Sequence, residues 1–497
     1  MTLLEVSDLH VRTRSTTLVR DLALNLEPGE RVGLIGESGS GKSLTALAIM
    51  GLLPENLHAT GSVTLEGMGN LLQLNDRILR TVRGKRIAMV FQEPMSALDP
   101  LMKVGKQIAE VRRTHGLAAT ATTVGDMLRD VDLPESMANS YPHELSGGQR
   151  QRVLIAMALA CDPDILLCDE PTTALDVTVQ KHIVKLILRL ADQAKAALLF
   201  ITHDLGLVAS TCERLLVMRN GEVVETGTTS EVLDTPQHDY TRMLVRAADL
   251  SEPRYVDIEA NGDVLLEARG ISRVRRGTTT LAETSLALHQ HQRLGIVGGS
   301  GSGKTTLLKI LAGLDNPTTG SVVRSPGTSL HMVFQDPQSS LNPRMRVGRS
   351  IAEPLHGMSA AQQQARVAEV LQEVDLEPDA ATRFPHEFSG GQRQRISIAR
   401  AIAAKPSVLL ADEPVSALDM SVRTQVMDLL DRLVRTHGLS LVFVSHDLAV
   451  VRQLCTDLIV LRNGEVVERG NVADIYNCPQ HDYTRQLLEA ALPLQVS

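Results

Sequence analysis

Two glycine-rich segments of the sequence have the composition of loops that bind phosphate. They comprise Gly36, Glu37, Ser38, Gly39, Ser40, Gly41, Lys42 and Ser43 in the first half, and Gly298, Gly299, Ser300, Gly301, Ser302, Gly303, Lys304 and Thr305 in the second. Each segment follows a short apolar run typical of a buried strand and precedes a run typical of a helix. Glycines allow the backbone to point several N–H groups at one phosphate beside a helix N-terminus. Two such matches in the same context predict two phosphate-binding loops.

The polar residues that end each loop indicate what it binds. Lys42 and Lys304 would supply a positive charge to the β- and γ-phosphates of a nucleotide, and the hydroxyl groups of Ser43 and Thr305 would coordinate Mg²⁺. The predicted cofactors are therefore ATP and Mg²⁺.

Two adjacent acidic residues end a second apolar run in each half. A carboxylate at a strand tip beside a phosphate loop can hold Mg²⁺, and we assign this role to Asp169 and Asp412. The next carboxylate can orient and deprotonate the attacking water, which makes Glu170 and Glu413 the predicted catalytic bases. The competing interpretation is that these acids only end a strand and stay solvated, and the accompanying phosphate loops argue against it.

A histidine follows a third apolar run in each half, at His203 and His446. An imidazole at a strand end can hydrogen-bond a γ-phosphate, although a single histidine is more often structural. Both lie at the same distance along the chain from Glu170 and Glu413, which favours a catalytic role. His143 and His386 are duplicated in the same way, and we interpret them as structural.

These motifs belong to an internal repeat with a nearly fixed offset. Gln92 and Gln335 are 243 positions apart, as are the acidic pairs and the histidines, whereas Lys42 and Lys304 are 262 apart. The first half therefore carries 19 extra residues between its phosphate loop and Gln92, which we place in a surface subdomain around residues 61–83. We expect a first domain at residues 1–248, a linker at 249–263 and a second domain at 264–497.

Two further duplicated segments resemble a known family. Ser146, Gly147, Gly148 and Gln149, with Ser389, Gly390, Gly391 and Gln392, look like the signature loop of ATP-binding-cassette ATPases. Gln92 and Gln335 resemble that family's Mg²⁺-binding glutamines, and Asp176 and Asp419 lie in segments that resemble its D-loop. The resemblance covers nearly the whole chain twice. It implies an α/β fold of two tandem P-loop NTPase domains, each with a RecA-like core, a helical signature subdomain and a β subdomain.

The resemblance also implies a head-to-tail pseudo-dimer within one chain. Each nucleotide would lie between the phosphate loop of one half and the signature loop of the other, where a second helix N-terminus adds donors and excludes solvent. All key polar positions occur in both halves, so we expect two sites that hydrolyse ATP. The family usually stacks adenine on an aromatic residue, but the matching positions here are Thr13 and Arg275. The guanidinium of Arg275 can stack on a base, whereas Thr13 cannot.

The segments 90–100 and 333–343 and the two His-Asp-Tyr-Thr-Arg stretches resemble the branch that serves oligopeptide, dipeptide and nickel importers. This resemblance implies two transmembrane permease subunits and an extracellular or periplasmic solute-binding protein as partners. The chain would then work at the cytoplasmic face of the membrane as a peripheral subunit. Coupling would run through the surface near Gln92 and Gln335. We expect no iron–sulfur centre, because only Cys478 lies where some relatives carry a cysteine cluster.

Composition restricts the alternatives. The 497 residues carry a formal net charge of −8 and contain no apolar stretch long enough to span a membrane. The five cysteines are scattered, which fits a reducing compartment. A soluble tandem ATPase acting on ribosomes or DNA would be expected to have a basic linker or cysteine pairs, so we expect no nucleic-acid partner. A nucleotide-binding scaffold without turnover is disfavoured by Glu170 and Glu413.

Overall fold

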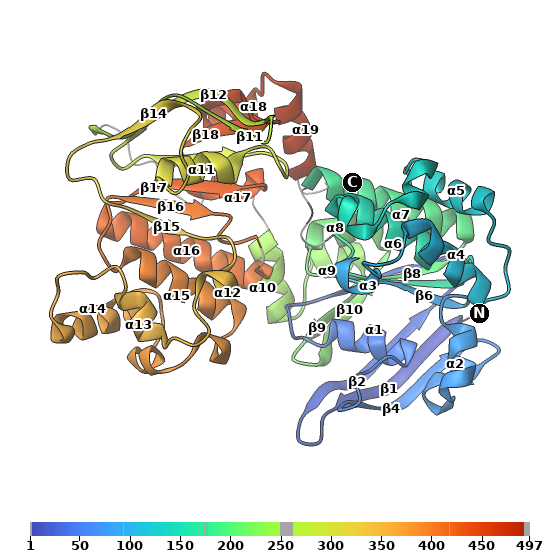
Figure 1. The fold of residues 1–497 in the computed structure, drawn as a ribbon. Coiled ribbons are helices and arrows are strands. Elements are labelled where there is room, and N and C mark those ends of the chain that lie inside the picture. Colours follow the sequence, from blue (N-terminus) through green and yellow to red (C-terminus); the bar gives the residue numbers. More distant parts are fainter. Residues whose placement is uncertain are drawn as a thin grey trace. The chain divides into compact units, whose positions relative to one another are not determined.

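The computed structural model describes residues 2–92, 94–172, 175, 177–248, 262–416 and 418–491. Its internal contacts divide the described residues into two units (Figure 1), one that holds nearly all of those up to residue 248 and one that holds those from residue 262 onward. Most of the predicted linker, residues 249–261, lies outside the described residues.

The first unit is built on a six-stranded sheet in the order β10-β9-β3-β8-β7-β6. Its strands are parallel except for β10. The strands β7 and β8 consist of residues that are all buried, as expected when helices cover both faces of a parallel sheet. The bounds are β3 Arg31–Ile35, β6 Ile87–Val90, β7 Ile165–Asp169, β8 Ala197–Thr202, β9 Arg214–Arg219 and β10 Glu222–Thr228.

A second sheet of the first unit has the order β2-β1-β4-β5. Buried and exposed residues alternate along β2, which is typical of an antiparallel sheet with one face on the core. Figure 1 shows helix α1 lying along this sheet, and side chains of both join one apolar core. The bounds are β1 Leu4–Arg12, β2 Thr17–Leu26, β4 His58–Leu65, β5 Gly69–Asn70 and α1 Lys42–Met50.

Helices of the first unit cover the core sheet and form a separate helical region between β6 and β7. Several of these helices begin at a serine, threonine or asparagine whose side chain caps the helix. The bounds are η1 Leu71–Gln73, α2 Asp76–Val82, α3 Pro94–Ala97, α4 Val104–Thr114, α5 Ala121–Asp130, η2 Glu135–Asn139, η3 Pro142–Glu144, α6 Gly147–Ala158, α7 Val177–Ala194, α8 Leu205–Thr211, α9 Thr229–Asp234 and α10 Asp239–Ala248.

The second unit repeats this architecture with sheet orders β15-β16-β17-β13-β18-β19 and β12-β11-β14. Figure 1 shows α11 on one side of the core sheet and α15 and α16 on the other. One apolar core joins α11 to both sheets, and a second joins α15 and α16 to the core sheet. The strand bounds are β11 Val264–Arg275, β12 Thr278–His289, β13 Arg293–Val297, β14 Thr319–Arg324, β15 Leu330–Val333, β16 Val408–Asp412, β17 Ser440–Ser445, β18 Asp457–Arg462 and β19 Glu465–Asn471.

The helices of the second unit follow the same order along the chain as those of the first. Their bounds are α11 Lys304–Ala312, α12 Pro337–Ser340, α13 Val347–Ala352, α14 Ala360–Glu373, η4 Pro378–Thr382, η5 Pro385–Glu387, α15 Gly390–Ile402, α16 Met420–His437, α17 Leu448–Leu454, α18 Val472–Asn477 and α19 Asp482–Ala491. Across the part of the chain that the structure describes, no helix combines the length and the apolarity needed to cross a lipid bilayer.

The extra residues of the first half form a local addition, as predicted. Leu4 pairs with Leu65 in the first unit, and its counterpart Leu266 pairs with Arg324 in the second. The chain of the first unit then continues into β5, η1 and α2, whereas the second unit goes on directly to β15. Leu65 and Arg324 are 259 positions apart, so 3 of the 19 extra residues lie between the phosphate loop and Leu65, and 16 lie between Leu65 and Gln92. Most of the addition therefore follows Leu65, within the predicted range 61–83, and β5 lies at the edge of the second sheet.

Candidate functional site

The glycine-rich loop of each unit connects the middle of the core sheet to a helix. In the first unit the loop joins β3 to α1, and in the second it joins β13 to α11. Gly41 and Gly303, which precede the helices, have φ angles of 106° and 102°. A Cβ at Gly303 would come within 2.7 Å of the Thr280 carbonyl oxygen. Only glycine suits this backbone, which directs the loop N–H groups and the helix N-terminus to one point.

The lysine that ends each loop is buried beneath it. Lys42 is 4% exposed, and its Nζ donates hydrogen bonds of 2.8 Å to the carbonyl oxygens of both Gly36 and Glu37. In the second unit, Lys304 Nζ donates to Gly298 at 2.7 Å and to Gly299 at 2.9 Å. The ammonium group is therefore fixed inside the curve of the loop, where a phosphate would sit.

A hydroxyl group and a buried carboxylate adjoin each loop. Ser43 Oγ donates to Asp169 Oδ1 at 2.9 Å, and Thr305 Oγ1 donates to Asp412 Oδ1 at 3.3 Å. Burial raises the pKa of both carboxyl groups, with the hydrogen bond from the hydroxyl acting against the shift. Each site thus has two oxygen ligands and a buried negative charge that a cation would stabilise, a donor set that suits Mg²⁺.

We expect Asp169→Asn to stabilise the metal-free protein. Because burial raises the folded-state pKa of Asp169, its charged form costs stability above that pKa, and the cost disappears as the pH falls through it. Asparagine keeps an oxygen that can accept from Ser43 but carries no charge. The thermal midpoint in a chelator at pH 7 should rise by roughly 2 °C, which corresponds to about 1 kcal/mol in a unit of this size.

The matched control for that measurement is Asp234→Asn, an exposed acid at the end of α9. Its midpoint should stay at the wild-type value, and the gain from Asp169→Asn should shrink near about pH 4. A midpoint for Asp169→Asn at or below that of the wild type at pH 7 would show that the buried charge costs nothing.

The second acid of each pair has an unusual backbone conformation. Glu170 and Glu413 both have φ of 44°, in the left-handed region that few residues other than glycine adopt. Their N–H groups donate to Ile201 at 2.8 Å and to Val444 at 3.0 Å on the adjacent strands β8 and β17. Such strain costs on the order of 1–3 kcal/mol and is common at active sites. Each glutamate directly follows the last residue of its strand, β7 or β16.

Two polar side chains hold each of these carboxylates. Gln92 Nε2 donates to Glu170 Oε2 at 2.9 Å, and His203 Nδ1 lies 3.2 Å from Glu170 Oε1. Because Gln92 and His203 come from segments outside β7, the geometry brings together three residues predicted separately. The structure shows the Nδ1 of His203 against the glutamate, and binding of a γ-phosphate by this histidine stays a prediction.

The second unit repeats this arrangement. Gln335 Nε2 donates to Glu413 Oε2 at 3.0 Å, and His446 Nδ1 lies 3.1 Å from the same oxygen. Although burial raises the pKa of Glu413, the hydrogen bond with His446 and the nearby charges of His446 and Lys304 lower it below its ordinary value. Glu413 is therefore ionised at neutral pH, as a general base must be.

The signature segments begin the helices α6 and α15. Gln149 N–H donates to Ser146 Oγ at 3.3 Å, and Ser146 N–H donates to Gln149 Oε1 at 2.8 Å. Ser389 and Gln392 form the same capping box at 3.3 and 3.0 Å. These residues thus bond to one another rather than to the loop of their own unit. Gly147, Gly148, Gly390 and Gly391 supply the first turns of the two helices.

Several other predicted positions are less informative. Asp176 lies outside the described residues, whereas the backbone oxygen of Asp419 begins α16 by accepting from Arg423 N–H at 2.7 Å. Thr13 Oγ1 accepts from Thr16 N–H at 2.9 Å in the turn between β1 and β2. Arg275 forms an ion pair with Asp315. Neither residue is aromatic, and stacking of the Arg275 guanidinium on adenine stays a prediction.

The sequence analysis missed one pair of contacts at the loops. The hydroxyl groups of Tyr240 and Tyr483 accept hydrogen bonds from the N–H groups of Glu37 and Gly299. Both tyrosines lie in the duplicated His-Asp-Tyr-Thr-Arg stretches. The repetition of these stretches at the common offset of 243 was a signal that they serve the same site in both units.

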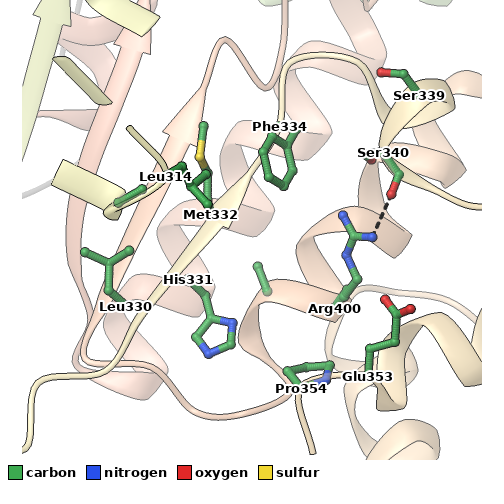
Figure 2. Close-up of a pocket in the computed structure, with 12 residues that line it drawn as sticks. Leu314, Leu330, His331, Met332, Phe334, Ser339, Ser340, Glu353, Pro354 and Arg400 are labelled. Carbon is green, nitrogen blue, oxygen red and sulfur yellow. Dashed lines mark hydrogen bonds between the residues drawn. The ribbon is translucent and has the colours of Figure 1, made fainter. Parts of the chain in front are cut away.

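The second unit has a pocket of about 650 Å³ beside β15. Figure 2 shows Phe334 on one side of it, and Arg400 and Glu353 on another, with Arg400 Nη1 donating to the Ser340 carbonyl at 2.7 Å. Counting back 243 positions, Met157 in the first half corresponds to Arg400. The pocket therefore carries a cation at a position where the first unit has an apolar side chain.

Comparisons with known proteins agree with this geometry. The family model described as "ABC transporter" matches residues 19–173 and 281–416. The model described as "Oligopeptide/dipeptide transporter, C-terminal region" matches residues 224–262 and 467–496. Each model thus matches once in each half of the chain.

Two named relatives align with almost the whole chain. The peptidoglycan transport ATP-binding protein YejF of Agrobacterium fabrum is 45% identical over 99% of this chain and 97% of its own length. The glutathione import ATP-binding protein GsiA of Escherichia coli K12 is 42% identical over 96% of this chain and 86% of its own length.

A solved structure shares the fold. The complex of archaeal ribosomal stalk protein aP1 and archaeal ribosome recycling factor aABCE1 contains a chain with a TM-score of 0.63, 22% identity and coverage of 90% of this chain and 86% of that chain. At this identity the likeness concerns the fold alone.

Proposed function

Because the chain belongs to the ABC transporter family, we propose that it is the ATP-hydrolysing subunit of a membrane importer for peptides or related small solutes. The observation that carries the proposal is the duplicated C-terminal region of oligopeptide and dipeptide transporters, which accompanies both ATPase segments. The names of the relatives, for peptidoglycan transport and glutathione import, support the same class of cargo.

Each unit has the side chains that hydrolysis requires. Lys42 and the loop N–H groups would bind and orient the phosphates, and Ser43, Asp169 and Gln92 would hold Mg²⁺, which supplies charge neutralisation when bound. Glu170, kept in place by Gln92 and His203, would accept a proton from the attacking water. Lys304, Thr305, Asp412, Gln335, Glu413 and His446 would have the same roles in the second unit.

We place each nucleotide between the two halves of the chain. Lys42 and Glu170 would face Ser389, Gly390, Gly391 and Gln392, while Lys304 and Glu413 would face Ser146, Gly147, Gly148 and Gln149. The capping boxes support this placement, because each serine oxygen accepts from the helix backbone and its O–H proton can be donated to a phosphate. The N-termini of α6 and α15 would add favourable dipoles.

The predicted partners are two permease subunits, which an extracellular or periplasmic solute-binding protein would supply with cargo. The chain would sit as a peripheral subunit at the cytoplasmic face of the membrane. Coupling would use the surface after Gln92 and Gln335. In the second unit the flanking residues Phe334, Ser339 and Ser340 line the pocket, which could receive a protruding segment of a permease.

Cysteine cross-linking tests this assignment. We expect Ser96→Cys and Ser339→Cys, each following one of the two glutamines, to form cross-links with a permease subunit when the complex is treated with a short bifunctional reagent. Ser230→Cys, on an exposed position of α9, serves as the control and should remain unlinked. Equal labelling of all three positions, or labelling of Ser230→Cys alone, would overturn the proposed coupling surface.

A further inference from the structure

The C-terminal region of each unit reaches back to the glycine-rich loop. Tyr240, in the first turn of α10, accepts a hydrogen bond of 3.0 Å from the N–H of Glu37, which is 203 residues earlier in the chain. Tyr483, in the first turn of α19, accepts one of 2.7 Å from the N–H of Gly299, 184 residues earlier. The same contact therefore forms independently in two units of different sequence.

The peptide groups involved are the ones that hold the loop lysines. The Gly36 carbonyl and the Glu37 N–H belong to one peptide group, and the carbonyl accepts from Lys42 Nζ at 2.8 Å while the N–H donates to Tyr240. In a trans peptide these two groups point in opposite directions. The tyrosine hydroxyl and the lysine ammonium thus hold the peptide plane from its two sides.

The second unit has the same two hydrogen bonds to one peptide group. The Gly298 carbonyl accepts from Lys304 Nζ at 2.7 Å, and the N–H of the same peptide group, at Gly299, donates to Tyr483 at 2.7 Å. No cis peptide bond occurs among the described residues. Rotation of this peptide would therefore break both hydrogen bonds at once.

Neighbouring groups fix the position of Tyr240. The Glu225 carboxylate accepts from the N–H groups of Gln237 and His238 at 2.7 and 3.0 Å, which anchors the segment before α10. His238 Nδ1 in turn accepts from the Tyr240 N–H at 3.1 Å, and the Arg219 guanidinium lies 4.8 Å from the centre of the tyrosine ring. Tyr240 is only 2% exposed.

In the second unit, Glu468 corresponds to Glu225 in the repeat. It accepts from Gln480 and His481 at 2.8 and 3.1 Å, and Arg462 lies 4.9 Å from the centre of the Tyr483 ring. Arg219 and Arg462 are the last residues of β9 and β18, and the turn after each strand also hydrogen-bonds to the glycine-rich loop. The N–H groups of Gly221 and Gly464 in these turns donate to the carbonyls of Ser40 and Ser302 at 2.9 and 3.0 Å.

We propose that Tyr240 and Tyr483 are positioning residues that set the conformation of the two glycine-rich loops and thereby connect the C-terminal regions to nucleotide binding. This inference rests on the proposed role of the loops in binding ATP. The hydroxyl group keeps the peptide before Glu37 or Gly299 in the orientation that holds the lysine. A loop ordered in advance loses less entropy when it binds phosphate, so its affinity is higher.

The test compares Tyr240→Phe, Tyr483→Phe and the double variant in the full-length chain, each of which keeps the ring and removes the hydroxyl. Hydrogen exchange without nucleotide should become about 2- to 10-fold faster in the loop of the altered unit only, at residues 36–43 for Tyr240→Phe and 298–305 for Tyr483→Phe. The KM for ATP of the double variant should rise by a similar factor, with kcat within about twofold of the wild type.

The matched control is Tyr476→Phe. Its ring also lies 4.8 Å from an arginine, Arg452, but its hydroxyl is buried without a hydrogen-bond partner among the residues that the structure describes. Exchange at both loops and the KM for ATP should be unchanged in this variant. Because hydrogen exchange is measured without ATP, it tests the role of the tyrosines even if the wild-type protein does not bind ATP. Failure of the wild type to bind ATP would refute the proposed function rather than this inference.

Two results would overturn the inference. In the first, loop exchange in both tyrosine variants equals that of the wild type. In the second, hydrogen exchange accelerates as much in the buried strands β7 and β16 as in the loops. That result would show that the hydroxyl groups stabilise the whole unit rather than the loop.

Discussion

Replacing Glu170 and Glu413 together by Gln should lower the rate of ATP hydrolysis by about 10²- to 10⁴-fold, the usual contribution of a general base. Glutamine has nearly the same shape but cannot accept the proton of the attacking water. It keeps an oxygen that can accept from the amide of Gln92 or Gln335, so the neighbouring side chains need not move. Affinity for ATP should stay near the wild-type value.

Each single replacement should remove at least half of the activity, because both units hold the base in the same left-handed conformation and with the same two partners. Glu222→Gln, which alters an exposed carboxylate paired with Arg20 at the surface, is the control and should retain full activity. If one of the two single variants hydrolyses ATP at the wild-type rate, the two sites are not both competent.

Replacing Lys42 and Lys304 by Ala should weaken ATP binding by about 10- to 150-fold at each site, the range for hydrogen bonds to a charged group. Both ammonium groups are buried within their loops, so no other cation can easily take their place. Removing the side chain also withdraws the donor that holds two loop carbonyls in each unit. The affinity is measured by titration with a fluorescent ATP analogue.

The control for the lysine variants is Lys106→Ala, an exposed cation on α4, which should bind the analogue like the wild type. Thermal unfolding of each variant checks that the units remain folded. Wild-type affinity in the folded double variant Lys42→Ala, Lys304→Ala would contradict the role of the glycine-rich loops in binding phosphate.

Much of the fold could be predicted from local sequence patterns. The apolar runs at 31–35 and 198–202 form β3 and most of β8 because a strand covered on both faces has apolar residues throughout. The constant offset of 243 between the halves indicated one architecture used twice. Its single interruption predicted an addition in the first unit, which the structure realises as β5, η1 and α2.

The detailed geometry of the site could not be predicted in the same way. The φ of Glu170 and Glu413 depends on hydrogen bonds to the adjacent strand, and propensity alone disfavours this conformation for glutamate. The contact between Tyr240 and Glu37 joins residues 203 positions apart, so no local pattern reports it. The duplication of the stretch that contains Tyr240 marks it as a shared feature of both halves, and only the packing of α10 shows that it contacts the loop.

The two units differ in the residues that line the pocket of the second unit, although the repeat predicts similar residues there. Pocket residue Arg400 corresponds to Met157, and His331 corresponds to Ala88 in the first half. Arg400 places a positive charge beside the proposed coupling surface, whereas burial lowers the pKa of His331 and favours its neutral form. Under the proposed function, the two halves would therefore present different side chains to the permease subunits, although their nucleotide sites are built alike.

The central claim is that each nucleotide is enclosed by both halves of the chain. A structure of the double variant Glu170→Gln, Glu413→Gln, trapped with ATP and Mg²⁺, tests it most directly. We predict that one γ-phosphate contacts Lys42 and Ser389 and that the other contacts Lys304 and Ser146. Triphosphates that are each enclosed by a single unit, with the serine of the other unit out of hydrogen-bond reach, would contradict the account.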